Sequence, residues 1–264
     1  MPRIGISTAC FYPDNVKNSL CRVASIGAPV TEVFMNSFGE MSEDMLQDLS
    51  ATAKNAGIEI ISFHPFLSAI EHMFFFSGYA PRVDDGLEIY KRFFEAAAVL
   101  GAKYFIFHGE KMQVRDSSPS SLPTELLLSV YDRLISSAES FGITFTQENV
   151  TMFRSENTSL IELLRKEFPT IGFALDIKQA LRAGKDIDEM IDSMGDRIVQ
   201  VHLNNYRDGV CTLPLAGTVD MPEIREKLQN VGYKGDCCIE VYRNNFSDDS
   251  ELSDSLARVS RIFN

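Results

Sequence analysis

Four acidic or imidazole side chains stand at the ends of four successive apolar segments in the second half of the chain. Residues 143–148 end in Glu148, residues 171–176 in Asp176, residues 198–202 in His202 and residues 237–240 in Glu240. These groups lie 28, 26 and 38 residues apart, which is about one strand-plus-helix unit each time. Neighbouring parallel strands lie about 4.8 Å apart, so groups at equivalent strand ends converge. Because three carboxylates in one place repel unless protonated or bridged by a cation, the pattern predicts a divalent metal site.

The ligand set of this predicted site combines three carboxylate oxygens with one imidazole nitrogen. Oxygen-rich sites favour Mn²⁺ or Mg²⁺, and the nitrogen also admits Co²⁺ or Zn²⁺, so one divalent ion is expected, with Mn²⁺ preferred. Four protein ligands leave room on a six-coordinate metal for two substrate oxygens, which suits an α-hydroxycarbonyl compound. A single strand-end Asp often only caps the next helix, but four such groups on consecutive strands favour a shared metal.

Short β-type segments alternate with helical patterns along the whole chain. Strands are expected at residues 3–8, 31–36, 59–65, 103–108, 143–149, 171–177, 198–204 and 235–242, and helices at 44–56, 83–100, 123–140, 160–168 and 221–231. The strand interiors are apolar, as in parallel strands buried on both faces. The pattern predicts a single-domain (β/α)8 TIM barrel over residues 1–264, with a doubly wound sheet as the alternative. In such a barrel the chemistry lies at the C-terminal strand ends, where His64 and His108 also fall.

The bulk composition excludes several classes of partner. Net charge is −12 with a pI near 4.8, and no Lys/Arg run reverses the field, so neither nucleic acid nor an anionic membrane is an expected partner. The N-terminus lacks a signal-peptide apolar region, and the five cysteines form no C-x-x-C pair. We therefore expect a reduced, cytoplasmic protein. Nucleotide-binding glycine motifs and the G-x-S-x-G hydrolase elbow are also missing from the sequence.

Four sequence motifs resemble those of the xylose-isomerase-like TIM-barrel superfamily, which contains sugar (phosphate) isomerases, epimerases and endonuclease IV. They are Thr-Gln-Glu148-Asn, Leu-Asp176-Ile-Lys-Gln-Ala, Val-His202-Leu-Asn-Asn and Ile-Glu240-Val, with a C-terminal signature at residues 213–220 and 232–235. The resemblance runs from about residue 4 to residue 242. It implies that the four matched residues bind one metal and that Glu148 and Glu240 exchange the substrate proton, as in the ketose 3-epimerase branch. A homo-oligomer is common in that superfamily.

The chain departs from the family pattern beside Asp176. Gln179 stands where the family often carries a His, and an amide hydrogen-bonds a substrate oxygen but does not readily serve as a second metal's ligand. Lys178 replaces a commoner small residue and either contacts a substrate phosphate or carboxylate, supplies a proton, or is a surface lysine. Arg207 corresponds to the family's loop arginine, with an ordinary loop residue as the alternative.

Further polar and aromatic residues are candidates for the pocket. His64 and His108 are expected to contact substrate, the alternative being core histidines bonded to backbone carbonyls. Glu32 resembles a glutamate often found on the second strand, where it makes a hydrogen bond beneath the pocket. The aromatic segment 66–79 is expected to form a lid, an oligomer contact or a short extra helix, and His72 within it is interpreted as structural.

The function predicted from these features is a metal-dependent isomerase or epimerase acting on a sugar, sugar phosphate or polyol. The metal chelates a carbonyl and an adjacent hydroxyl, one glutamate removes the neighbouring proton, and the other glutamate returns a proton to the enediolate. Three alternatives stay open. They are an inosose-type dehydratase, an endonuclease IV-like phosphodiesterase and a catalytically inactive sugar-binding barrel. Gln179 and the net charge of −12 oppose the phosphodiesterase.

Overall fold

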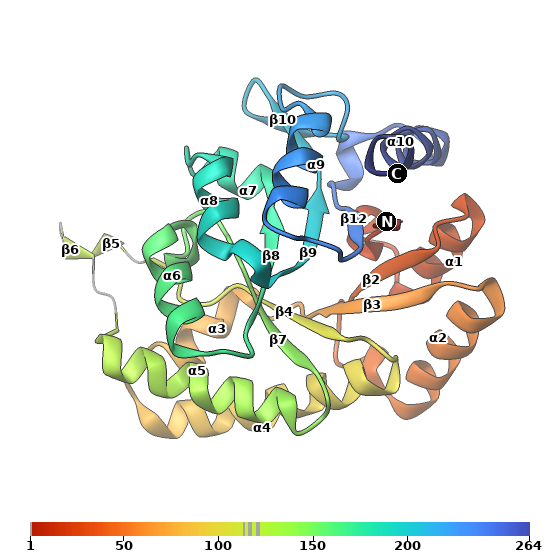
Figure 1. The fold of residues 1–264 in the computed structure, drawn as a ribbon. Helices are drawn as coiled ribbons and strands as arrows, with labels where there is room; N and C mark the ends of the chain where they lie inside the picture. The colour runs from red at the N-terminus through yellow and green to blue at the C-terminus, as the bar shows by residue number, and fades with distance from the viewer. Residues whose placement is uncertain (1, 113, 116–117, 120–121) are drawn as a thin grey trace.

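Eight parallel strands follow one another around a nearly closed barrel (Figure 1). The structure is a computed structural model that describes residues 2–112, 114–115, 118–119 and 122–264. The strands are ordered β1-β12-β9-β8-β7-β4-β3-β2. Their bounds are β1 Ile4–Ile6, β2 Val30–Phe34, β3 Glu59–His64, β4 Tyr104–Phe107, β7 Thr144–Glu148, β8 Gly172–Asp176, β9 Ile198–Leu203 and β12 Cys237–Ile239. Each predicted strand is present within a few residues, and the predicted (β/α)8 barrel is confirmed.

Strands β1 and β2 are the first and last strands of the eight-stranded sheet. They are joined by side-chain contacts and not by a ladder of backbone hydrogen bonds. Thr31 Oγ1 donates a hydrogen bond to the Ile6 carbonyl at 2.7 Å. Gly5 permits this approach, because a Cβ at that position would lie 2.1 Å from the Val30 carbonyl oxygen. The absence of a side chain at Gly5 therefore lets the barrel close.

Helices surround the strands, and the small β5–β6 hairpin projects away from the barrel at the left of Figure 1. The helices are α1 Val16–Ile26, α2 Glu43–Ala56, α3 Ser68–Phe75, α4 Ala80–Val99, α5 Thr124–Glu139, α6 Thr158–Glu167, α7 Ile177–Arg182, α8 Ile187–Met194, α9 Met221–Asn230 and α10 Asp249–Phe263. The hairpins are β5 Val114–Arg115 with β6 Ser118–Pro119, and β10 Asn205–Arg207 with β11 Val210–Thr212. All five predicted helices are present, and α1, α7, α8 and α10 lie outside the helix ranges named from the sequence.

Side chains alternate along each strand, so one set packs under the helices and the other faces the barrel interior. On β3, Phe63 packs against Phe93 of α4, and the next residue, His64, turns inward. On β7, Phe145 packs toward α4, and Glu148, three residues later, faces inward. The outward-facing apolar residues of these strands thus anchor the inward-facing polar residues at the C-terminal rim.

The aromatic segment 66–79 contains a short extra helix, α3, which was one of the three interpretations of its sequence. Phe75 is fully buried and contacts the Tyr90 ring edge-on at 4.8 Å between centroids. Glu71, also buried, accepts hydrogen bonds from the Tyr90 hydroxyl at 2.7 Å and the Gly109 N–H at 2.9 Å. Tyr79 at the end of the segment is 59% exposed. The helix therefore packs into the protein and is tied to the chain just beyond β4.

Among the described residues, none of the helices has the length and apolarity needed to cross a membrane.

Candidate functional site

Strands β7, β8, β9 and β12 bring the four predicted metal ligands together. One ligand atom from each of the four lies within 4.8 Å of the other three. The Nδ1 atom of His202 lies 3.1 Å from Glu148 Oε1, 3.7 Å from Asp176 Oδ2 and 3.5 Å from Glu240 Oε2. The first three residues are buried, and the Glu240 side chain is 14% exposed. The convergence follows from register, since Asp176 on β8 stands directly beside His202 on β9.

The His202 ring is held from below by a buried carboxylate. Its Nε2 lies 3.0 Å from Glu32 Oε2, which also accepts hydrogen bonds from Ser62 Oγ at 2.9 Å and Gln200 Nε2 at 2.8 Å. Burial alone would raise the pKa of Glu32, but His202, together with His64 and Ser62, outweighs burial and lowers that pKa to about 2. An ionised Glu32 favours a proton on Nε2, which leaves Nδ1 facing the other carboxylates. The predicted hydrogen bond of Glu32 beneath the pocket is therefore observed.

Glu32→Gln is expected to weaken Mn²⁺ binding by on the order of 10–100-fold, the usual effect of losing a carboxylate that orients a ligating histidine. The substitution keeps the side-chain shape but removes the charge that orients His202. Isothermal titration of metal-depleted protein with Mn²⁺ measures the change, and near-UV circular dichroism checks the fold. Glu59→Gln, which alters a half-exposed pair with Arg3 on the barrel's other end, is the control. An unchanged Kd in Glu32→Gln would contradict the positioning role.

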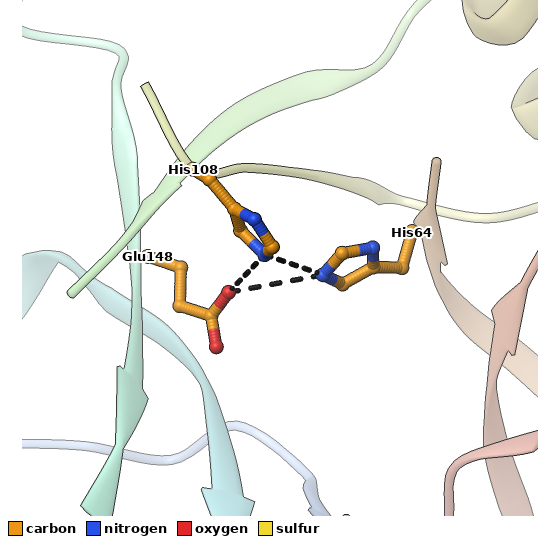
Figure 2. Close-up of side chains that lie close together, drawn as sticks. All are labelled: His64, His108 and Glu148. Atoms are coloured by element: carbon orange, nitrogen blue, oxygen red, sulfur yellow. Dashed lines mark hydrogen bonds and ion pairs between the residues drawn. The ribbon is translucent and has the colours of Figure 1, made fainter. Parts of the chain in front are cut away.

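A second group of candidate ligands shares Glu148 with the first. Figure 2 shows His64, His108 and Glu148 pointing toward one another, and their ligand atoms also lie within 4.8 Å. His108 Nε2 lies 2.8 Å from Glu148 Oε2 and 2.9 Å from His64 Nε2. His64 Nδ1 donates to the Pro65 carbonyl at 3.0 Å, so its Nε2 is free to accept or to ligate. The structure thus places both predicted substrate contacts against Glu148.

Lys178 lies inside the first group rather than on the surface. Its Nζ lies 2.5 Å from Asp176 Oδ2 and 2.5 Å from Glu240 Oε2, and the side chain is 3% exposed. Burial alone would lower the pKa of Lys178, but the carboxylates, led by Asp176 and Glu240, outweigh it and raise the pKa well above its ordinary value. The surface-lysine alternative is therefore wrong, because the first turn of α7 faces the site.

The two glutamates of the site differ in their acidity. Burial alone would raise the pKa of Glu148, but His108, followed by His202 and His64, lowers it well below its usual range. Burial raises the pKa of Glu240, and the opposing effects of Lys178 and His202 do not cancel it. Carboxylates whose environments separate their pKa values are suited to different proton-transfer roles.

A family model described as a xylose isomerase-like TIM barrel matches residues 20–262. The chain belongs to this family. Among curated proteins, an uncharacterised protein of Methanocaldococcus jannaschii is 23% identical over 273 residues, which cover 99% of this chain and 90% of that protein. The resemblance deduced from the four strand-end motifs is thereby confirmed at the level of the family.

Solved structures similar to this member of the xylose isomerase-like family include sugar epimerases. D-psicose 3-epimerase of Clostridium cellulolyticum, solved with D-tagatose, has a TM-score of 0.80 and 17% identity, with 99% of each chain covered. The 3-keto-D-glucoside 4-epimerase of E. coli has a TM-score of 0.79 and 17% identity, covering 99% of this chain and all of that one. At such low identity these likenesses establish the fold.

The donor set of this xylose isomerase-like barrel fits the divalent metal that the family implies. Three carboxylates and one imidazole converge in a buried place, and oxygen-rich sets of this kind suit hard divalent ions. Glu148 Oε2 is buried and close to His108, yet within the described residues no donor meets it in hydrogen-bonding geometry. An acceptor of this kind fits a cation or a substrate hydroxyl. Glu148, Asp176, His202 and Glu240 could therefore hold the ion.

The side chains of two predicted substrate contacts make hydrogen bonds away from the ligand atoms, although the Gln179 backbone N–H donates to Asp176 Oδ1 at 3.0 Å. The Gln179 side-chain oxygen accepts a hydrogen bond from the Thr151 N–H at 3.3 Å, on the loop after β7. Arg207 is exposed on the β10–β11 hairpin and donates to the Gly217 carbonyl at 3.3 Å. Contact of either residue with substrate stays a prediction.

Two buried asparagines support Asp176 and were missed in the sequence. Asn149 exchanges two hydrogen bonds with the Asp176 backbone, at 2.8 and 2.9 Å. Asn204 Nδ2 donates to Asp176 Oδ1 at 3.1 Å, and its oxygen accepts from the Lys178 N–H at 2.6 Å. The sequence signal for these asparagines was their position, one residue after Glu148 and two residues after His202. An amide at either position reaches the end of the neighbouring strand.

Proposed function

We propose that this protein is a divalent-metal-dependent sugar isomerase or epimerase, whose substrate is a sugar, sugar phosphate or polyol derivative. The observation that carries the proposal is the placement of Glu148 and Glu240 on β7 and beside β12, with Asp176 and His202 on the two strands between them. Two carboxylates from non-adjacent strands thus approach one place. Such a pair can remove and return a proton at one carbon of a substrate bound between them.

Different residues of the chain have different roles in the proposed reaction. A divalent ion at the four ligands would polarise the substrate carbonyl and acidify the neighbouring C–H bond. Glu148, kept ionised by the surrounding histidines, accepts the proton from that carbon. Glu240, whose pKa is raised, delivers a proton to the opposite face for epimerisation or to the neighbouring carbon for isomerisation. His64 and His108 lie beside Glu148, where they can hydrogen-bond the substrate oxygens.

Solvent exchange tests this proposal directly. The protein, loaded with Mn²⁺, is incubated in D₂O with ketoses, aldoses, their phosphates and inososes, and deuterium incorporation is followed by NMR. We expect incorporation at a carbon next to the carbonyl for one substrate class, and none with metal-depleted protein. Deuterium at C3 of a ketose indicates epimerisation, transfer between C1 and C2 indicates isomerisation, and loss of water identifies the dehydratase. Binding of sugars with neither deuterium exchange nor product formation would reject the enzyme in favour of a sugar-binding barrel.

A phosphodiesterase is the second candidate, because the group formed by His64, His108 and Glu148 shares a carboxylate with the first group. A carboxylate shared between two ligand sets is how paired metal ions are held near one phosphate. The net charge of −12 opposes binding of a nucleic acid backbone. Cleavage of an abasic-site DNA duplex in the presence of Zn²⁺, without sugar exchange under Mn²⁺, would favour this function.

A further inference from the structure

The Lys178 ammonium contacts two of the four atoms that are predicted to bind the metal. Asp176 Oδ2 and Glu240 Oε2, each 2.5 Å from Nζ, also face His202 Nδ1 at 3.7 and 3.5 Å. Both oxygens would therefore have to serve an ammonium and a metal ion together. These oxygens also lie away from solvent, since the Lys178 side chain is 3% exposed and the Asp176 side chain is fully buried.

The ammonium and a divalent ion compete for these oxygens, because each draws on the same two carboxylates. A divalent ion binds carboxylate oxygens at about 2.0–2.2 Å, which is closer than Nζ approaches them. Two cations bound to the same oxygens would lie within a few ångströms of each other, and burial strengthens their repulsion. Without any cation, however, three buried carboxylates would repel one another. A cation beside Asp176 and Glu240 reduces this repulsion, and either the Lys178 ammonium or a metal ion can supply it.

We propose that Lys178 is a tethered cation that competes with the divalent metal for Asp176 and Glu240, so that metal binding displaces its ammonium. This inference rests on the metal site of the proposed function. The lysine weakens metal binding by stabilising the carboxylates in its own ion pairs. It also keeps the buried carboxylates compensated whenever no metal is bound.

The neighbouring Tyr242 gives the displaced ammonium a place to go. Nζ already lies 5.7 Å from the centre of the Tyr242 ring, within the range of a cation–π contact. Tyr242 is 50% exposed at the edge of the site, and Arg182 donates to its hydroxyl at 3.1 Å. A rotation of the flexible lysine side chain toward this anchored ring carries the ammonium toward solvent.

Metal titration of Lys178→Met tests the competition without any activity assay. Methionine fills a similar volume but carries no charge, so the carboxylates lose their competitor. We expect Mn²⁺ to bind about tenfold or more tightly than to the wild type, the scale on which side chains outside the ligand set affect metal affinity. Lys166→Met, at an 80% exposed lysine, is the matched control and should leave the Kd unchanged. An equal or weaker affinity in Lys178→Met, or in Lys178→Gln if methionine impairs folding, overturns the inference.

Chemical labelling of the wild type gives an independent readout. Acetic anhydride should modify Lys178 slowly in metal-depleted protein and at least several-fold faster with saturating Mn²⁺, whereas Lys166 reacts equally in both. Unchanged or slower labelling of Lys178 contradicts displacement. If the wild type binds no Mn²⁺, tight binding by Lys178→Met still supports the competition, and no binding by either overturns it. Mn²⁺ binding that survives Asp176→Asn instead removes the proposed metal site itself.

Discussion

Glu148→Gln is expected to abolish deuterium exchange at the substrate carbon and to lower kcat by about 10³-fold, within the usual contribution of a positioned general base. The substitution removes the carboxylate that faces both groups of candidate ligands. Glu148 Oε1 faces His202 Nδ1 at 3.1 Å, and Oε2 faces His108 Nε2 at 2.8 Å. An amide retains the shape and one oxygen for a metal, but it cannot accept a proton from carbon at neutral pH.

Two further variants separate the roles of Glu148. Glu148→Asp keeps the charge but shortens the side chain, so it should retain metal and lose most of the proton transfer. Glu156→Gln, on the loop after β7, changes a carboxylate that accepts a hydrogen bond from the Met152 N–H and belongs to neither ligand group. Its exchange rate should match the wild type. Wild-type exchange in Glu148→Gln would exclude Glu148 as the base and shift that role to Glu240.

The barrel and its inward-facing strand ends were predictable because both depend on local sequence pattern. Apolar segments of strand length, separated by helices, identify parallel strands buried on both faces, and alternation decides which residues face inward. Gly57 and Gly101, whose positive φ angles are 69° and 75°, lie just after α2 and α4. These glycines therefore indicate in the sequence where the two helices end. These same rules place the four strand-end groups at one end of the barrel.

The partners of each side chain were harder to predict, because they depend on how the strands are staggered. The β8–β9 register shifts between Phe173 and Ala174, and this irregularity brings Asp176 level with His202. His64 and His108 were predicted one by one, but their meeting at Glu148 requires the relative heights of three strands. Lys178 differs again. Helix position alone leaves it free to face either solvent or the site, and only the assembled carboxylates favour the inward orientation.

Metal content is expected to distinguish one ligand group from two. After incubation with Mn²⁺ and desalting, mass spectrometry should find about one ion per wild-type chain, since four converging donors suit one divalent ion. Asp176→Asn and His202→Ala should each lose most of it. His202 supplies the only nitrogen of its group, and Asp176 is needed for the oxygen-rich ligand set.

The matched variant for this measurement is His108→Ala, which disrupts only the group formed by His64, His108 and Glu148. If a single ion occupies the first group, this variant retains it, and loss in Asp176→Asn and His202→Ala assigns the site. Two ions in the wild type, one of which disappears in His108→Ala, would show that both groups bind metal, and the phosphodiesterase would then gain over the isomerase. No ion in any sample would reject both metal-dependent functions, because the charges of the strand-end groups would then be compensated by Lys178 and the histidines without a metal ion.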